Sequence, residues 1–580
     1  MNPERFYIKP EEVEHFTSLY QILDHAKNHY PDKTAYRQFL TRNEEISFTF
    51  SQIAHNTDTL RAALLNRDFA EKHCAIFGET SAEWITAYLA VVSGMGTAVP
   101  LDRELPAETL ITQLDFAEAE LVFCSAKGLK KLRQVLPLCQ SIKTVVLMRS
   151  YEVPELENCS AEVLLMNELI AEGEELLKNS DGQTVPAIDP DKTCVIIYTS
   201  GTTGANKGVM LSNRSIMGTL RGCARLLHYP STSFSVLPIN HSYELHAHIM
   251  SCMYCGTTVC INDDLKHLVN NLERFAPEMS CMVPVMLDLL VKRLKKQIAD
   301  SGREKQFYRT LRFSNALRKA GIDRRRKLFA SVLDALGGNL RMIICGGAAL
   351  KQDTADFLIG IGIDIFNGYG ITECSPVAAV NPLAKIKRNS VGHILPTMEV
   401  RIEQTDENGN GEIQLKGDNV MKGYYKAPED TAAVFTQDGW FRTGDIGRID
   451  KDNFLYISGR LKNLIILANG KNVFPEEIEE ELMKRIPYIR ECVVYSDEAG
   501  TGIYALCCPD EEFIREHASD SSAAVKEYMQ NDMNGFNSAM PGYKRITDFE
   551  ITEKEFEKST THKIQRYKIA AIKKGANENV

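Results

Sequence analysis

Short apolar runs alternate with longer amphipathic stretches along the first two thirds of the chain. Residues 193–198, 342–345 and 364–366 are rich in β-branched or other apolar side chains, and each run leads into a turn that contains glycine. Residues 83–93 and 284–298 instead carry apolar side chains at helical spacing. Strands that alternate with helices predict an α/β fold, in which ligand loops follow the carboxyl ends of the strands.

The pattern changes after about residue 400. Residues 400–402, 412–415 and 454–457 alternate between apolar and polar side chains, and turn residues separate them, which predicts a small antiparallel β region. A helix is predicted from Pro475, because proline and glutamates fill its first turn. We therefore predict a large domain over residues 1–458, a hinge over 459–462 and a small domain over 463–580.

The composition excludes some classes of function. With 580 residues the chain is too long for one core, and its net charge of −10 gives no support for nucleic-acid binding. Lysine and arginine are dense over residues 312–335, which we interpret as a solvated helical face. The 15 cysteines show no disulfide framework, and the first residues carry no signal-like apolar stretch, so we expect a cytoplasmic protein.

Residues 198–208 read Tyr-Thr-Ser-Gly-Thr-Thr-Gly-Ala-Asn-Lys-Gly and directly follow a predicted strand. The glycines let backbone N–H groups turn toward an anion, the hydroxyls can donate to phosphate oxygens, and Lys207 adds a positive charge. The spacing is not that of a Walker A loop, and the chain has no GxGxxG after a strand. The segment predicts a nucleotide-phosphate loop.

This loop resembles the phosphate-binding signature of the adenylate-forming superfamily, which includes acyl-CoA synthetases, firefly-type luciferases and peptide-synthetase adenylation domains. The family usually has proline where this chain has Asn206, so the loop would be less stiff here. The resemblance implies a large α/β domain, with two α/β subdomains and a small β region, and a small mobile α+β domain after it. The residues that it implies for phosphate contact are Thr199, Ser200, Gly201, Thr202, Thr203, Gly204 and Lys207.

Residues 368–373, Gly-Tyr-Gly-Ile-Thr-Glu, match the second signature of this superfamily. An aromatic ring between glycines can lie flat against a purine, and a carboxylate suits Mg²⁺, which prefers oxygen ligands. The resemblance implies that Tyr369 stacks on adenine and that Thr372 contacts the α-phosphate. It also implies that Glu373 binds magnesium together with Thr202.

Three further segments resemble nucleotide-binding parts of the family. Gly346 and Ala348 belong to a Gly-Gly-Ala segment where a base could approach the main chain closely, and Asn367 would lie beside it. Asp445 would accept from both ribose hydroxyls, and Arg460 would lie near the ribose and phosphates. In the same segment as Arg460, Lys462 would act as the hinge.

Near the C-terminus, residues 557–566 resemble the family pattern whose last lysine drives adenylation. Lys563 would neutralise the charge that develops as a carboxylate attacks the α-phosphate. The family usually has glycine where this chain has His562, which affects the expected conformation of the loop. After rotation of the small domain, Gly470 would let a pantetheine arm pass close to the backbone.

The implied reaction uses MgATP to turn an acid into an acyl-adenylate and then passes the acyl group to coenzyme A. Residues 234–248 contain no aspartate that could hold an amino-acid amine, and residues 238–244 and 472–477 resemble long-chain fatty acid ligases. We therefore predict a medium- or long-chain fatty acid as the substrate. His241 is a candidate pocket-lining residue, with a structural histidine as the alternative.

Other readings stay open at the sequence level. The acceptor thiol could belong to an acyl carrier protein, the acid could be aryl or cyclic, or the chain could be a non-catalytic homologue that binds nucleotide. The cluster of His246, His248, Cys252, Cys255 and Cys260 has partial zinc-ligand spacing, but its apolar surroundings favour buried free thiols. A lipid substrate is compatible with peripheral membrane contact, and the sequence does not indicate an oligomeric state.

Overall fold

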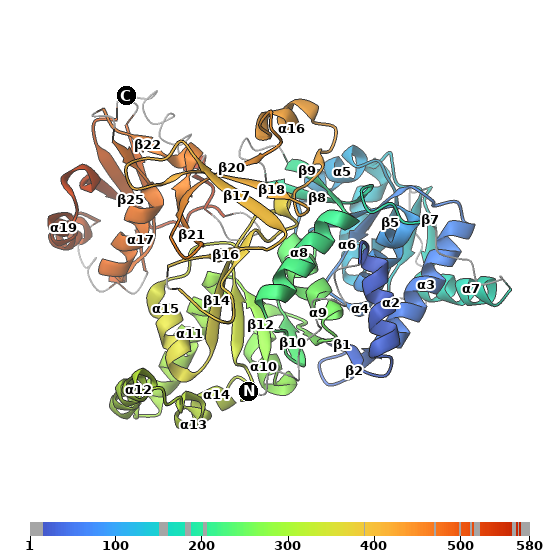
Figure 1. The fold of residues 1–580 in the computed structure, drawn as a ribbon, viewed down its shortest axis with the longest axis horizontal. Coiled ribbons are helices and arrows are strands. Elements are labelled where there is room, and N and C mark those ends of the chain that lie inside the picture. Colours follow the sequence, from blue (N-terminus) through green and yellow to red (C-terminus); the bar gives the residue numbers. More distant parts are fainter. Residues whose placement is uncertain are drawn as a thin grey trace. The chain divides into compact units, whose positions relative to one another are not determined.

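The structure is a computed structural model that divides into two compact units. Unit 1 comprises residues 1–399 and 415–441, and unit 2 comprises residues 400–414 and 442–580. The residues that the structure describes are 16–149, 160–179, 187–200, 206–387, 389–468, 471–497, 500–510, 513–515, 522–558, 564–566 and 568–569. Figure 1 shows the course of the chain through both units.

Unit 1 contains two sheets. The strands of its first sheet, in spatial order, are β19 (Gly423–Tyr424), β9 (Asn206–Ser212), β8 (Thr193–Ser200), β4 (Thr97–Leu101), β3 (His73–Phe77), β5 (Ala119–Cys124), β6 (Thr144–Leu147) and β7 (Glu162–Leu165). Strands β8 to β7 run parallel, whereas β9 returns antiparallel to β8. The helices that connect these strands or follow them are α3 (Phe50–Asn66), α4 (Ala82–Ala90), α5 (Ala107–Phe116), α6 (Ala126–Val135), α7 (Met166–Lys178) and α8 (Asn213–Leu226), with η2 (Val91–Met95) and η3 (Leu136–Leu138).

The second sheet of unit 1 is also mostly parallel. Its strands, in spatial order, are β16 (Gly392–Ile394), β15 (Ala379–Val380), β14 (Asp364–Tyr369), β13 (Met342–Cys345), β12 (Met279–Met282), β10 (Thr232–Ser235), β11 (Thr258–Ile261), β1 (Thr34–Phe39) and β2 (Glu45–Thr49). Its helices are α2 (Leu19–His29), η4 (Tyr243–Met250), α9 (Ser251–Tyr254), η5 (Leu265–His267), α10 (Leu268–Phe275), α11 (Pro284–Asp300), α12 (Glu304–Lys319), α13 (Arg325–Leu328), α14 (Ala330–Asp334), α15 (Gln352–Ile361) and η6 (Thr372–Cys374). Unit 1 also contains α16 (Pro428–Val434).

Side chains at the helix ends explain several boundaries. Thr49 begins α3 with a capping box, in which its hydroxyl accepts from the Gln52 backbone while the Gln52 side chain accepts from Thr49. At the other end of a helix, Gly321 lies at φ +81° directly after α12, and the backbone N–H of Ile322 donates to the carbonyl of Leu317. This left-handed glycine ends α12, because few other residues adopt that conformation without strain.

The predicted strands 342–345 and 400–402 and the predicted helix 284–298 are confirmed. The basic segment 312–335 is not one helix, because the Gly321 turn separates α12 from α13 and α14. The strand predicted over residues 193–198 continues to Ser200, because β8 pairs with β9 up to that residue. The α/β fold class, with a large N-terminal part and a smaller C-terminal part, is confirmed.

Unit 2 combines a meander with a small α+β body. Its meander has the strand order β17 (Met398–Glu403), β18 (Gly411–Gly417), β20 (Phe441–Ile449) and β21 (Phe454–Arg460). The α+β body contains η7 (Leu461–Asn463), β22 (Ile465–Ile466), β23 (Asn472–Val473), α17 (Pro475–Arg485), β24 (Ile489–Ser496), β25 (Ile503–Pro509), α19 (Ser522–Ala539), η8 (Gly542–Lys544) and β26 (Ile546–Ile551). Its core packs Ile478, Val494, Met529 and Phe549 together.

The chain passes between the units at residues 399/400, 414/415 and 441/442, and the predicted domain boundary near residue 458 stays a prediction. The hinge over residues 459–462 therefore lies inside unit 2, at the end of β21 and in η7, and stays a prediction. Among the described helices, none has both the length and the apolar character needed to cross a membrane.

Candidate functional site

The β8–β9 hairpin carries the predicted phosphate loop at its tip. Thr199 lies opposite Lys207 in the antiparallel register, and Ser200 lies opposite Asn206. Residues 201–205 connect the two strands, so Gly201, Thr202, Thr203 and Gly204 lie outside the described residues. The hairpin places Lys207 at the base of the predicted loop, where a strand holds its backbone.

Strand β14 and the turn after it hold the second signature. Asn367 and Tyr369 belong to the last half of β14, and Thr372 and Glu373 begin the short helix η6. A Cβ atom on Gly370 would lie 1.8 Å from the carbonyl oxygen of Pro376, so only glycine fits between these two chain segments. All four polar or aromatic side chains are partly exposed, as a binding surface requires.

Four side chains of unit 1 form a series of contacts that ends at Glu373. The hydroxyl of Tyr424 donates to Glu373 Oε1 over 2.9 Å, and Lys207 Nζ lies 4.8 Å from the centre of the Tyr424 ring. Lys207 Nζ also lies 2.9 Å from Asp430 Oδ1. Burial, followed by the charge of Glu373, raises the pKa of Tyr424, which keeps its hydroxyl a donor. We call Lys207, Glu373, Tyr424 and Asp430 the Glu373 group.

The backbone fixes this group as well. The N–H of Met421 donates to the carbonyl of Glu373, and the N–H of Tyr425 donates to the carbonyl of Gly208. The segment 421–425 therefore joins η6 to the return strand of the hairpin, although the three segments lie far apart in sequence. As a result, Lys207 and Glu373 share one neighbour, Tyr424.

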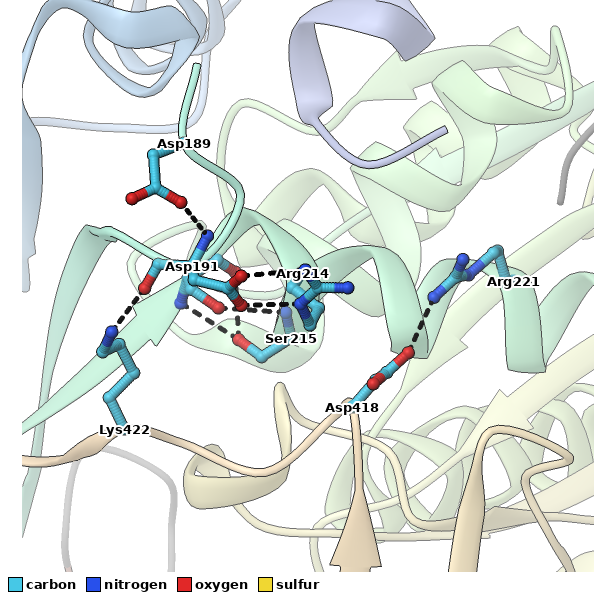
Figure 2. Close-up of polar contacts among 8 residues, drawn as sticks. Asp189, Asp191, Arg214, Ser215, Arg221, Asp418 and Lys422 are labelled. Atoms are coloured by element: carbon cyan, nitrogen blue, oxygen red, sulfur yellow. Dashed lines mark hydrogen bonds and ion pairs between the residues drawn. The ribbon is translucent and has the colours of Figure 1, made fainter. Parts of the chain in front are cut away.

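Figure 2 shows how ion pairs anchor the segment that leads to Tyr424. Arg214 on α8 holds Asp191 with two hydrogen bonds of 2.6 and 2.8 Å, and Lys422 donates to the Asp191 carbonyl. About two helical turns after Arg214 on α8, Arg221 donates to Asp418 over 3.0 Å. These contacts hold residues 418–422 against α8 and the start of β8.

A surface hollow of about 570 Å³ lies beside these anchors, lined by residues that include His73, Thr97, Thr193 and Lys422. His73, Thr97 and Thr193 are the first residues of β3, β4 and β8. The hollow thus lies at the amino ends of parallel strands, whereas ligands in such sheets bind at the carboxyl ends. It is a less suitable site than the signatures, which lie at the carboxyl ends of β8, β13 and β14.

The adenine-site segment lies close to η4. Tyr243 donates to the Ile344 carbonyl over 3.0 Å, and its ring would lie 3.5 Å from a Cβ on Gly346. Gly346 is buried and Ala348 is exposed at the carboxyl end of β13. Ser242 donates to Thr372 Oγ1 over 3.4 Å, which brings η4 into contact with the second signature.

A fully buried charged network lies directly behind these contacts. His248 Nδ1 lies 3.0 Å from Glu244 Oε2, and its Nε2 lies 2.6 Å from Ser233 Oγ. Ser235 donates to the other oxygen of Glu244. Burial opposes a charge on His248, but the charge of Glu244 and the hydrogen bonds to Glu244 and Cys252 outweigh it and raise the pKa of His248 to about 10. We call Glu244, His248, Ser233 and Ser235 the Glu244 network.

Two of the candidate zinc ligands are thus engaged elsewhere. His248 contacts Glu244 and Ser233, and His246 Nε2 lies 2.9 Å from the Tyr88 hydroxyl. Burial lowers the pKa of His246 to about 3, so it is neutral. Within the described residues no group of three or more His, Cys, Asp or Glu side chains could hold a metal ion. His241 is partly buried, and its carbonyl accepts from the Leu245 N–H at the start of η4.

Unit 2 holds the predicted ribose contacts. Asp445 and Arg460 are directly opposite in the β20–β21 register, and Arg460 Nε lies 3.0 Å from Asp445 Oδ1. The Asp445 side chain is 4% exposed and its backbone N–H donates to Thr443 Oγ1. The sequence placed both residues in one site, and the structure brings them into contact.

The C-terminal part of unit 2 fixes the chain on one side of the predicted catalytic lysine. Arg566 pairs with Glu479 and donates to the Val494 carbonyl. Burial raises the pKa of Glu479 to about 7, although the charge of Arg566 lowers it. Lys563 itself, His562 and Gly470 lie outside the described residues, and their roles stay predictions.

Sequence reasoning missed Tyr424, Asp430 and Ser242. Each of the three contacts a predicted site residue that lies far away in sequence. Ser242 is 130 positions from Thr372, Tyr424 is 51 positions from Glu373, and Asp430 is further still from Lys207. No local pattern marks such partners. For Glu244 and His248 a signal did exist, because two charged residues four positions apart in an apolar run indicate a buried pair.

Comparison with known proteins agrees with this arrangement. The model of the family described as AMP-binding enzyme matches residues 23–425, and the model of the AMP-binding enzyme C-terminal domain matches residues 462–574. Long chain acyl-CoA synthetase 2 of Arabidopsis thaliana is 28% identical over 538 residues, which cover 86% of this chain and 80% of that protein. The human long-chain-fatty-acid–CoA ligase ACSBG1 is 30% identical over 508 residues, which cover 83% and 68%.

Solved structures share the fold. The adenylation domain of a carboxylate reductase from Mycobacterium chelonae superposes with a TM-score of 0.76 at 20% identity, covering 97% of this chain and 90% of that one. The anthranilate CoA ligase AuaEII in complex with anthranoyl-AMP gives a TM-score of 0.74 at 18% identity, with 97% and 99% covered. Together with the two family models and the long-chain ligase relatives, the grouping of the signatures in unit 1 shows that this chain belongs to the AMP-binding enzyme family.

Proposed function

We propose that this enzyme activates a medium- or long-chain fatty acid with ATP and then transfers the acyl group to coenzyme A. In the first step a carboxylate oxygen attacks the α-phosphorus of ATP, and pyrophosphate leaves. In the second step the thiol sulfur attacks the acyl carbon, the thiol loses its proton, and AMP leaves. The observation that carries the proposal is the Glu373 group, which joins the phosphate-loop lysine to the second signature.

The polar groups of unit 1 suit a bound triphosphate. Lys207 is paired with Asp430 by its Nζ, and a phosphate oxygen could take the place of that carboxylate. The Thr372 hydroxyl accepts a hydrogen bond from the Ser242 hydroxyl, so two hydroxyls lie together where we place the α-phosphate. Tyr369, between two glycines, is proposed to stack on adenine, with Asn367, Gly346 and Ala348 along the base.

Glu373 fits a magnesium ligand. Its Oε1 accepts from Tyr424, and among the described residues no donor reaches its other oxygen, which leaves one carboxylate oxygen for a hard cation. Magnesium, when bound there with Thr202, would offset the negative charge of the phosphates. Tyr424 orients the carboxylate, and Lys207 and Lys563 supply the protein's own positive charge.

In unit 2, Asp445 is proposed to accept from the ribose hydroxyls, with Arg460 beside it. The substrate class follows from the relatives, whose names specify long-chain fatty acids, and from residues 238–244, which adjoin the Gly346 segment through Tyr243. His241 is proposed to line the acyl pocket. The described cysteines are all free thiols, which supports a reducing compartment such as the cytoplasm.

The test is acid-dependent release of pyrophosphate from MgATP, with and without coenzyme A, over fatty, aryl and amino acids. We expect release with fatty acids, and AMP with acyl-CoA only when coenzyme A is present. Thioester formation only on a carrier protein would assign another acceptor, and a preference for aryl acids would assign another substrate. No release with any acid, while ATP still binds, would leave a nucleotide-binding homologue and contradict the proposal.

A further inference from the structure

Exposed apolar side chains are concentrated in one segment of unit 1. Fifteen large hydrophobic residues are exposed in the described chain, and six of them fall within residues 285–328. Leu289 is 63% exposed and Phe313 is 58% exposed, and the other four are Val285, Tyr308, Ile322 and Leu328. Single exposed hydrophobics need no explanation, but a concentration of them marks an interaction surface.

Basic side chains occupy the same helix faces. On α11 the exposed residues Val285, Leu289, Lys292, Arg293 and Lys296 fall within an arc of about 100° of the helix. On α12 the exposed Arg309 and Arg312 lie between Tyr308 and Phe313 on an arc of about 140°. The opposite faces bury Leu287, Leu290, Leu294 and Phe307.

The charge of this segment is opposite to that of the chain. Residues 284–328 contain 14 lysines and arginines against 4 aspartates and glutamates, although the whole chain has a net charge of −10. Arg325 pairs with Asp323 and Asp364, and so has a structural role. In the part of the chain that the structure describes, Arg309 and Arg312 form no ion pair, and neither do the exposed lysines of α11 and α12.

The helices that carry these residues lie together. Figure 1 shows α11, α12 and α13 at one end of unit 1, where each packs against α15. Their solvent faces therefore belong to one region of unit 1 and present arginine or lysine next to leucine, tyrosine and phenylalanine. We call the exposed side chains of residues 285–328 the basic–apolar surface.

We propose that the basic–apolar surface docks this enzyme on anionic lipid. Lysine and arginine next to a membrane are attracted by its negative surface potential, while leucine and aromatic side chains enter the boundary between head groups and acyl chains. Nucleic acid would use the positive charge but offers no partner to Leu289 on its phosphate backbone. An acidic protein is the competing partner, and the experiment distinguishes it.

The proposal goes beyond the proposed function, because vesicle binding needs neither ATP nor an acid. It would bring an enzyme for fatty acids to the phase in which these acids concentrate. The surface residues make no contact with the Glu373 group or the Glu244 network that the structure records. Failure of lipid binding would therefore leave the adenylation chemistry untouched, and failure of adenylation would leave lipid binding untouched.

The test is sedimentation of the full chain with vesicles of phosphatidylcholine alone or with roughly a third phosphatidylglycerol. We expect binding to the anionic vesicles only, and weaker binding as salt is added. The variant Arg309→Glu/Arg312→Glu should bind at least about 30-fold more weakly, since each basic residue near such a surface adds roughly a fivefold factor and reversal adds repulsion. The variant Leu289→Ser/Phe313→Ser should lose about tenfold and retain the salt dependence.

A matched control lies on α6 and η3 of the same unit. Lys130 and Arg133 are exposed there and form no ion pair with any described residue, and Leu138 is 65% exposed. Lys130→Glu/Arg133→Glu changes the net charge by the same amount as Arg309→Glu/Arg312→Glu. This control variant, alone or combined with Leu138→Ser, should bind vesicles like the unaltered chain. Melting temperatures and pyrophosphate release with a water-soluble acid should be equal in all variants.

Three outcomes would overturn the proposal. The unaltered chain could fail to bind anionic vesicles, the control could lose as much binding as Arg309→Glu/Arg312→Glu, or neither surface variant could change binding. If vesicles are not bound but purified acyl carrier protein is, and Arg309→Glu/Arg312→Glu abolishes that binding, the surface docks an acidic protein instead of lipid.

Discussion

The Glu244 network and the Glu373 group lie on two segments, η4 and η6, that the Ser242–Thr372 hydrogen bond brings into contact, yet they differ in how their charges are satisfied. Glu244 and His248 are fully buried and contact each other. Ser235 donates to Glu244, and Ser233 contacts His248. Lys207 and Asp430, by contrast, have side chains that are 23% and 50% exposed and pair across a surface. The closed network has no role for a ligand, whereas the open group holds its charges in contacts that a ligand can replace.

Charge alone therefore does not identify a functional residue. Both sets contain a glutamate with a hydroxyl donor and a cation near it. What distinguishes the proposed site from its support is its exposure, together with the Glu373 oxygen that no donor among the described residues reaches. Substitutions in the closed network should therefore change stability first, and those in the open group should change the reaction first.

The largest effect is expected from Glu244→Gln. Removing the carboxylate leaves His248 buried without its counter-charge, which should lower the free energy of unfolding by about 3–5 kcal/mol. Urea denaturation at pH 7 measures this loss. Glu108→Gln, at an exposed position on α5, is the control and should stay within about 0.5 kcal/mol. A Glu244→Gln variant as stable as the control would contradict a buried ion pair.

Glu373→Gln should show the opposite pattern. The amide keeps the size of the side chain but loses the charge, so pyrophosphate release should fall by about 100- to 1,000-fold, or roughly 2.7–4 kcal/mol of activation free energy. The melting temperature should stay within a degree or two, because the side chain is partly exposed. A variant with full activity would remove Glu373 from the proposed site.

The pH dependence of stability sharpens the contrast. The pKa of His248 rises from 6.5 to about 10 on folding. The stabilisation that protonated His248 gives the folded state is therefore complete below pH 6.5 and is lost as the pH rises through 10. Stability of the unaltered chain should thus decline over this window, by up to about 1.4 kcal/mol per pH unit from this group. His248→Gln should be less stable at pH 7 and show a shallower decline. Parallel curves for the two proteins would show that His248 does not carry a buried charge.

The smallest effect is expected from Tyr424→Phe, which removes one hydrogen bond to Glu373. Loss of a bond worth about 1 kcal/mol should slow pyrophosphate release roughly fivefold. Tyr425→Phe is the matched control, since the Tyr425 hydroxyl donates to Glu118 at the surface. Equal effects of both substitutions would mean that Tyr424 does not orient Glu373.

Much of the framework was predictable because it depends on local pattern. The strand 342–345 and the helix that begins at Pro475 follow from apolar runs, glycine turns and helix-start residues. The resemblance implied that Asp445 and Arg460 would both lie near the ribose, and the register of β20 and β21 brings the two side chains into contact.

The rest depends on contacts between distant segments. Tyr424 reaches Glu373 only because β19 pairs with β9, and nothing in the residues around Tyr424 indicates that pairing. The division into units also depends on such contacts, because residues 400–414 group with unit 2 whereas residues 415–441 group with unit 1. The basic segment was read from its charge, whereas the exposure of Leu289 and Phe313 required the packing of α11 and α12.

The π-helical form of η4 has a consequence for insertions and deletions. A π-helix holds one residue more per turn than an α-helix needs, so deletion of a single residue within Tyr243–Met250 would leave a segment able to form an ordinary α-helix. The two ends of the segment would keep nearly the same relative orientation, because about four α-helical residues cover the same rotation as about five π-helical residues. Ser242 and Tyr243 would then still face Thr372 and Ile344 while His248 kept its place. The π-helical segment should therefore tolerate a one-residue deletion better than an ordinary helix such as α11, in which the same deletion would turn one end by about 100° relative to the other.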